Sequence, residues 1–98
     1  MNEIRLMTDK PDKAVEILND ALALEKARLQ YSLELSQKRL KYFEEKYGID
    51  SERFMIEGAA EDLEEHDMEY VEWAGEYKLA TSMINRIDVI TGIRHEPS

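Results

Sequence analysis

Residues 11–47 read PDKAVEILNDALALEKARLQYSLELSQKRLKYFEEKY, and this stretch decides the fold because nothing after Pro11 in it breaks a helix. The run predicts one continuous helix of roughly 55 Å, at about 1.5 Å per residue. Asp9 and Pro11 are typical of a helix start, since Asp9 can accept a hydrogen bond from the free amides of the first turn. Gly48 predicts the end of the helix, because glycine readily adopts the left-handed conformation found there.

Apolar side chains form two stripes along this predicted helix, at steps of three, four or seven residues. Glu25 and Ser36 interrupt the main stripe, which comprises Val15, Leu18, Leu22, Leu29, Leu33, Leu40, Phe43 and Tyr47. The second stripe lies beside it and comprises Ile17, Ala21, Leu24, Tyr31 and Leu35. So wide an apolar face predicts contact with more than one neighbouring helix, and it leaves open which stripe is internal.

Two further helices are predicted after Gly48. Asp50 or Ser51 would cap a short helix over about 51–57, whose Phe54 and Ile56 would close the end of the hairpin. An acidic connection follows, and a third helix is predicted over about 66–91. The predicted core stripe of the third helix comprises Tyr70, Trp73, Tyr77, Ala80, Ile84 and Ile87, flanked by Met83 and Ile90.

These elements predict an all-α fold with two long antiparallel helices, about 11–47 and 66–91, and a short helix, about 51–57, at the turn. The chain, 1–98, would form a single helical-hairpin domain, with a flexible arm at 1–8 and a flexible tail at 94–98. One partner helix cannot cover the broad apolar face of the first helix, so hairpins are expected to associate into a four-helix bundle. We therefore predict a homodimer or a higher bundle of this chain, with an obligate complex with a different protein as the alternative.

Composition excludes several classes of function. A net charge of −9 argues against nucleic-acid binding, which requires clustered Lys and Arg. The absence of cysteine excludes disulfides and thiolate metal sites, and it fits a reducing compartment. Residues 1–7 lack the apolar segment of a signal peptide, and no apolar run approaches the roughly 18 residues that a membrane span needs. We therefore expect a cytoplasmic protein with neither a membrane nor a nucleic acid as partner.

Acidic and aromatic residues gather at the turn end of the predicted hairpin. Residues 57–76 contain many Asp and Glu and no Lys or Arg. Aromatic side chains dominate binding hot spots, and an acidic rim suits a basic partner protein. The predicted partner-binding residues are Phe54, Tyr70, Trp73, Tyr77, Glu69, Glu72 and Glu76. Packing around the turn is the alternative account of the aromatic residues.

A metal site is the main competing hypothesis. Glu65, Glu69, Glu72 and Glu76 share one helix face, with His66 near its start, as in carboxylate-rich, ferritin-like metal proteins. The Glu-x-x-His pair of such sites is missing, because Leu63 stands three residues before His66. We therefore prefer a solvated face with no metal or cofactor, and we keep the ferritin-like protein as the alternative.

Catalytic residues are not predicted. No serine within the predicted helices has a histidine three or four residues away, and the chain holds only two histidines. We therefore expect a protein that is not an enzyme. Gly75 inside the third helix has two interpretations: close approach of a neighbouring helix, which we prefer, or a gap for a partner's side chain.

The segments YFEEKYGIDSERF (42–54) and DMEYVEW (67–73) resemble a pattern shared by small prokaryotic helical proteins, F-E-x-K-Y-G-x-x-S-E-x-F followed by D-x-x-x-x-E-W. The resemblance covers roughly residues 40–92. Some of these proteins are antitoxin-like partners encoded beside small toxins. The resemblance implies a binding role with no catalytic residues. The predicted function is therefore a non-catalytic protein–protein interaction module, antitoxin-like, which would neutralise a basic toxin by charge complementarity.

Overall fold

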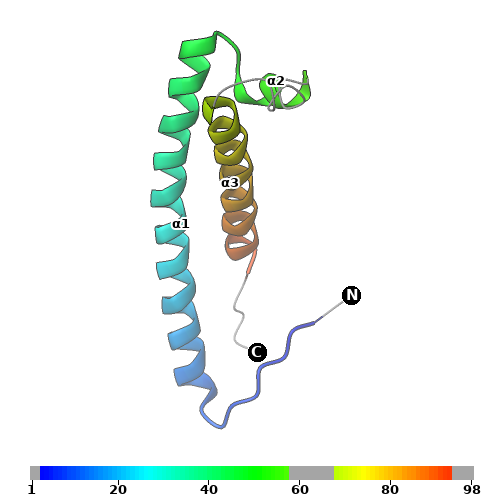
Figure 1. Cartoon of the computed structure of the whole chain (residues 1–98). Helices are drawn as coiled ribbons and strands as arrows, with labels where there is room; N and C mark the ends of the chain where they lie inside the picture. Colours follow the sequence, from blue (N-terminus) through cyan, green and yellow to red (C-terminus); the bar gives the residue numbers. More distant parts are fainter. Residues whose placement is uncertain (1–2, 58–67, 94–98) are drawn as a thin grey trace.

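The computed structural model describes residues 3–57 and 68–93, in which all regular structure is helical (Figure 1). α1 spans Pro11–Tyr47, α2 spans Ser51–Ile56 and α3 spans Met68–Thr91. α1 and α3 lie side by side and run antiparallel, and α2 lies at the turn end of the pair (Figure 1). This arrangement confirms the predicted all-α hairpin. The predicted association into a bundle involves further chains and stays a prediction.

Some predicted boundaries fall outside the described residues. The acidic connection, the predicted start of the third helix at residue 66 and the tail at 94–98 lie there. Residues 3–8 are described and contain no regular secondary structure. Among the helices of 3–57 and 68–93, none is long and apolar enough to cross a membrane.

The helix ends follow local sequence signals, with one correction. The residue that caps α1 is Lys10, and no side chain caps its first turn, so the prediction of Asp9 as the cap is wrong. Asp9 stands one residue too early; its neighbour Thr8 instead accepts a hydrogen bond from the Lys10 amide at 3.0 Å. Gly48 ends α1 as predicted, with φ of 68° and its amide donating to the Glu44 carbonyl.

Of the two predicted caps of α2, Asp50 and Ser51, Asp50 is the one observed. Its carboxylate accepts a hydrogen bond from the Arg53 amide at 2.8 Å. The other candidate, Ser51, is buried and accepts a hydrogen bond from Trp73 instead. Phe54 packs into the end of the hairpin as predicted, whereas Ile56 is 72% exposed. Residues two apart point to different sides of a helix, so α2 buries only one of the two.

The main stripe of α1 is the internal one. Leu29, Ser36 and Phe43 are buried along it, seven residues apart, and they face α3. The second stripe faces outward, with Leu24 and Tyr31 among its exposed residues. The choice between the two stripes is therefore made by where α3 packs.

The buried face of α3 differs from the prediction at Ile84 and Met83, and at Ala74, which is buried although it was not predicted as a core residue. Trp73, Ala80 and Met83 are buried, whereas Ile84 is 42% exposed. Successive residues are about 100° apart around a helix, so Ile84 lies at the edge of a face centred on Ala80 and Met83. Ile84 is therefore not a core residue of the hairpin, and Met83, predicted as a flank, is.

The α1–α3 seam contains one polar cluster at its middle. The Ser36 hydroxyl is completely buried and donates a hydrogen bond to the Glu76 carboxylate. Arg39 Nη1 lies 3.3 Å from Oε1 of the same carboxylate. A short serine opposite a longer glutamate fills the seam, and the hydrogen bond satisfies the buried Ser36 hydroxyl.

Gly75 does not mark a close approach between helices within this chain. A Cβ built on Gly75 would meet no atom within 4 Å, so the preferred interpretation is wrong for the isolated hairpin. The physical reason is its position on the exposed side of α3, away from α1. The alternative, a gap for a partner's side chain, stays a prediction.

Gly75→Ala is expected to raise the free energy of unfolding by about 1 kcal/mol, because alanine restricts the unfolded chain and favours the helix. Urea unfolding followed by circular dichroism measures the change. Gly48→Ala is the control with the opposite sign, since Gly48 has a positive φ that alanine tolerates poorly. A destabilised Gly75→Ala variant would contradict the exposed helical placement of this residue.

Candidate protein-binding surface

The predicted aromatic site at the turn end is mainly a core. Trp73 is completely buried and Phe54 is 1% exposed, and their rings stack with centroids 3.9 Å apart. Phe43 and Tyr47 stack against Trp73 at 5.6 Å and 5.5 Å. Tyr70 is half-buried and meets the Phe54 ring edge to face. The aromatic residues from all three helices thus hold the turn end together.

A hydrogen bond fixes the orientation of the indole. Trp73 Nε1 donates to Ser51 Oγ at 2.8 Å, and both groups are buried. The packing alternative therefore accounts for Phe54 and Trp73, and their assignment as partner-contacting residues is corrected. No partner reaches either side chain while the hairpin is closed. Tyr77 and Tyr70 keep partly exposed surface.

The three described acidic residues of the predicted site do not form one rim. Glu69 pairs with Lys46 and accepts a hydrogen bond from the Tyr47 hydroxyl at 3.0 Å. Glu76 is turned toward α1, where it meets Ser36. Glu72 is exposed. Only Glu72 therefore presents its carboxylate to a partner without first giving up a contact with α1.

Stability is expected to fall at acidic pH through Glu69. The Lys46 ammonium, and after it the Tyr47 hydroxyl, hold the pKa of Glu69 below its usual 4.5. A carboxyl whose pKa is lowered in the folded state stabilises that state above its unfolded-state pKa, and this contribution is lost as the pH falls through the folded-state value. The free energy of unfolding of the Glu69→Gln variant should therefore fall less steeply than that of the unchanged chain as the pH drops below about 4.5.

Unfolding midpoints measured across this pH range test the expectation. Glu72→Gln is the matched control, because it removes an exposed carboxylate one helical turn away. Equal acid dependence in Glu69→Gln and in the unchanged chain would contradict a stabilising role for the Lys46–Glu69 pair.

The metal hypothesis finds no support in residues 3–57 and 68–93, where no group of three His, Asp or Glu residues lies close enough to hold an ion. Glu69 and Glu76 are engaged with Lys46 and Arg39, respectively. Glu65 and His66, the other members of the hypothetical site, lie outside the described residues.

The largest exposed apolar feature of α1 is the second stripe, which continues to Tyr42. We call this surface the outer stripe, and it comprises Ile17, Ala21, Leu24, Tyr31, Leu35 and Tyr42. The exposed fractions are 65% for Ile17, 73% for Leu24 and 65% for Tyr31. The opposite edge of α1 is polar and carries Asn19, Gln30 and Gln37. Apolar exposure is therefore concentrated on one side of α1.

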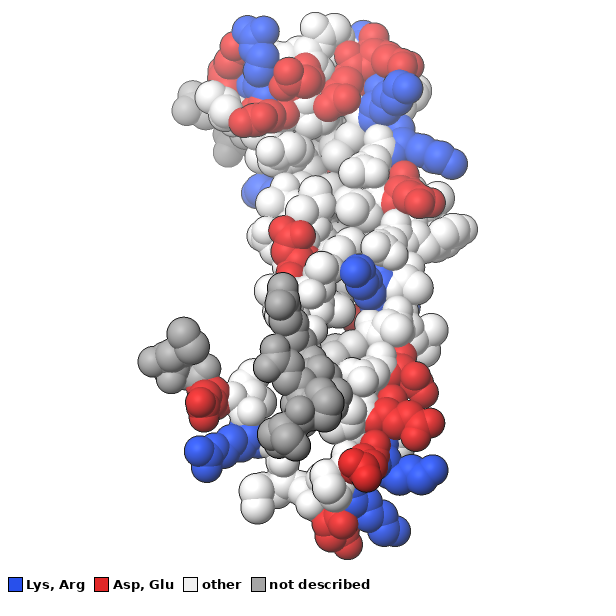
Figure 2. Space-filling model, turned by 180° about the vertical axis from the view of Figure 1, so that it is seen from behind, with Lys and Arg blue, Asp and Glu red and all other residues white. Residues whose placement is uncertain are grey.

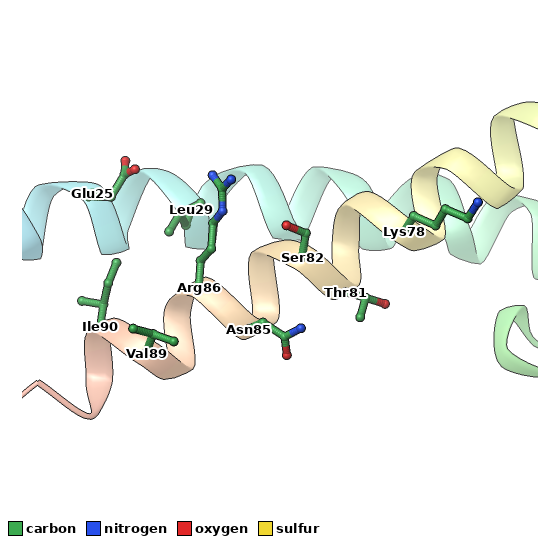
Figure 3. A pocket seen from close by; sticks show the side chains of 9 residues that line it. All are labelled: Glu25, Leu29, Lys78, Thr81, Ser82, Asn85, Arg86, Val89 and Ile90. Atoms are coloured by element: carbon green, nitrogen blue, oxygen red, sulfur yellow. The ribbon is translucent and has the colours of Figure 1, made fainter. Parts of the chain in front are cut away.

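An open groove of about 550 Å³ runs between α1 and α3 (Figure 3). Leu29 and Glu25 line it from α1, and Arg86 reaches from α3 toward them (Figure 3). Glu25 pairs with Arg28, and this hydrogen bond is the main cause that lowers the pKa of Glu25, with a smaller contribution from Arg86. Val89 and Ile90 complete an apolar floor beside these charges.

A second open groove of about 560 Å³ lies nearer the turn. Lys38, Arg39 and Tyr42 line it from α1, and Glu72 and Glu76 line it from α3. The second groove therefore borders the outer stripe, of which Tyr42 is a member, whereas the first groove is lined from α1 by Glu25 and Leu29 of the main stripe. The spacing of the second stripe is visible in the sequence, where it predicts, as an alternative to the Trp73 end, a surface that a partner could bury.

Charges on the face shown in Figure 2 crowd the two ends of the hairpin, and uncharged side chains cover much of the middle. At the turn end, basic and acidic residues are interleaved, because Lys46 pairs with Glu69 and Arg53 pairs with Glu57. The described part of the turn end is therefore mixed in charge rather than purely acidic.

No protein-family model matches the chain, and comparisons with curated proteins and with solved structures found no match. The function is therefore argued from the surface of the hairpin.

Proposed function

We propose that this chain is a non-catalytic protein-binding module that binds through the outer stripe. The observation that supports the proposal is the exposure of apolar residues at regular spacing along one side of α1. Leu24, Tyr31 and Ile17 are each about two-thirds exposed or more. Contiguous apolar patches on soluble proteins mark interaction surfaces, because leaving them in water is unfavourable.

The charged groups beside the stripe also favour binding over catalysis. Glu25 is held by Arg28 with oxygen–nitrogen distances of 2.6 Å and 2.9 Å, and Glu76 is held by Ser36 and Arg39. A general acid or base needs a group that can exchange a proton with a substrate. Side chains engaged in this way instead shape the rim of an apolar contact surface.

The test is a binding comparison between the unchanged chain and a Leu24→Ser/Leu35→Ser variant. Light scattering reports self-association, and affinity capture from native lysate reports other partners. We expect association by at least one route, and its loss in the variant. Ala23→Ser/Gln37→Ser is the matched control on the polar side of α1 and should behave like the unchanged chain. A monomer that captures nothing would overturn the proposal.

An antitoxin-like role in the cytoplasm is the more specific form of this proposal. It draws on the net charge of −9, which suits a basic toxin, and on the resemblance of residues 40–92 to antitoxin-like proteins. Co-expression with a small reading frame adjacent to its gene should restore growth that the frame alone arrests. Absence of any such neighbour, or unchanged arrest, would contradict the antitoxin role and leave the binding module intact.

A further inference from the structure

We infer that the outer stripe binds a second copy of this chain in antiparallel orientation, with α1 packed along α1 and the centre of the contact between Arg28 and Tyr31. The inference rests on the proposed function and adds to it the partner, the orientation and the register. It is carried by the spacing of the exposed residues, by their symmetry and by the charges beside them.

The spacing is that of a coiled coil. Successive positions along this side of α1 are separated alternately by four and by three residues. These positions are Ile17, Ala21, Leu24, Arg28, Tyr31, Leu35, Lys38 and Tyr42. A repeat that averages 3.5 residues keeps one seam facing one partner helix over its whole length. The buried main stripe already uses the neighbouring side of α1 for α3, so this second repeat needs another helix.

The positions of the stripe are symmetric about its midpoint, which lies between Arg28 and Tyr31. Leu24 and Leu35 lie equally far on either side of this midpoint. An antiparallel pair therefore places Leu24 of each copy opposite Leu35 of the other copy. Ile17 and Tyr42 form the outermost apolar layer in the same way. A two-fold dimer requires a patch that complements itself, and this stripe satisfies the requirement.

The central layer also favours the antiparallel orientation. Arg28 of one copy lies opposite Tyr31 of the second copy, where a guanidinium and an aromatic ring attract one another. In a parallel, in-register pair, Arg28 would face Arg28 of the second copy and Lys38 would face Lys38. Like charges opposed in a seam disfavour that orientation.

Charges that flank the seam complement one another in this register. Asp20 lies beside Lys41 of the second copy, and both side chains are exposed in the single chain. Glu34 lies beside Ala27 of the second copy, and Arg39 lies beside Leu18. None of these flanking pairs opposes two like charges, which supports self-association despite the net charge of −9.

The position of α3 fits a four-helix bundle. On α1, the buried positions and the outer stripe are separated by roughly a quarter to a third of a turn, at about 100° per residue. A helix in a four-helix bundle contacts two neighbours in this way. The groove of about 560 Å³ that Lys38, Arg39 and Tyr42 line from α1 borders the side that the second copy would cover.

Cysteine cross-linking tests the orientation and register, because the chain contains no cysteine. Leu24→Cys and Leu35→Cys are prepared separately and then mixed under mild oxidation. We expect a disulfide-linked dimer in the mixture and none with either variant alone. In the antiparallel register, two copies of Leu24→Cys lie eleven residues apart along the axis, roughly 16 Å at about 1.5 Å per residue. A disulfide needs Cα atoms within about 7 Å.

The matched control mixes Ala23→Cys with Gln37→Cys, on the polar side of α1, and should give no link. A link in either single variant would show a parallel pair, and no link in any mixture would show another interface; both results overturn the inference. A chain that stays unlinked but captures a different protein through the outer stripe overturns it and leaves the proposed function standing. An unlinked monomer that captures nothing overturns both.

Light scattering of Leu24→Glu/Leu35→Glu supplies an independent readout. We expect the mass to fall from twice the chain mass of 11.5 kDa to the single-chain mass. Both leucines are exposed in the hairpin, so the helical signal of the monomer should persist. A dimer that survives this double substitution would overturn the inference.

Discussion

Trp73→Ala is expected to lower the free energy of unfolding by about 3–5 kcal/mol, a large share of the roughly 5–15 kcal/mol that stabilises a typical domain. The indole is completely buried and stacks on Phe54 with a centroid distance of 3.9 Å. Removing it opens a cavity where all three helices meet, and it leaves the buried Ser51 hydroxyl without its donor. Urea unfolding followed by circular dichroism and near-ultraviolet signals measures the loss.

Tyr42→Ala is the matched control for this substitution. Tyr42 is an aromatic residue of α1 that is 56% exposed, so its removal should change the stability of the monomer little. The two variants together separate folding from binding. A Trp73→Ala variant that keeps its full stability but no longer binds a partner would show that Trp73 contacts the partner, and it would contradict the placement of Trp73 in the core.

Glu76→Ala is expected to lower the free energy of unfolding by about 1–3 kcal/mol, because it removes the carboxylate that satisfies a buried hydroxyl. Ser36 is completely buried and donates to Glu76, and Arg39 meets the same carboxylate at 3.3 Å. Glu72→Ala is the control, since its exposed carboxylate should contribute less than about 0.5 kcal/mol.

Rescue by an apolar pair distinguishes a lost hydrogen bond from lost packing. Combining Ser36→Ala with Glu76→Met removes both polar partners and keeps the seam filled, so most of the stability should return. The same chemical unfolding measurement applies. A double variant no more stable than Glu76→Ala would show that packing of the longer side chain, rather than the buried hydrogen bond, accounts for the loss.

The candidate surface was only partly predictable. The aromatic and acidic residues at the turn end suggested a partner site, yet Trp73 and Phe54 proved to be core residues. Aromatic side chains are typical of both cores and hot spots, so residue type alone does not separate the two. Glu69 and Glu76 likewise belong to contacts with α1 whose partners lie far away in the sequence.

The sequence by itself determined the helices, because their limits depend on neighbours along the chain. Pro11 and Gly48 bound α1, and Asp50 caps α2, through backbone geometry and hydrogen bonds that act within one turn. The same local periodicity showed two apolar stripes on α1 and one on α3.

Only the tertiary structure decided what each apolar stripe contacts. Both stripes of α1 satisfy the same helical repeat, and burial depends on where α3 packs, which no local signal encodes. α3 covers Leu29, Ser36 and Phe43 and leaves Leu24 and Tyr31 exposed. The polar Ser36, an interruption of the pattern in the sequence, lies at the centre of the seam because Glu76 stands opposite it. Long-range packing thus separated the surface that folds the hairpin from the surface that we propose binds a second copy.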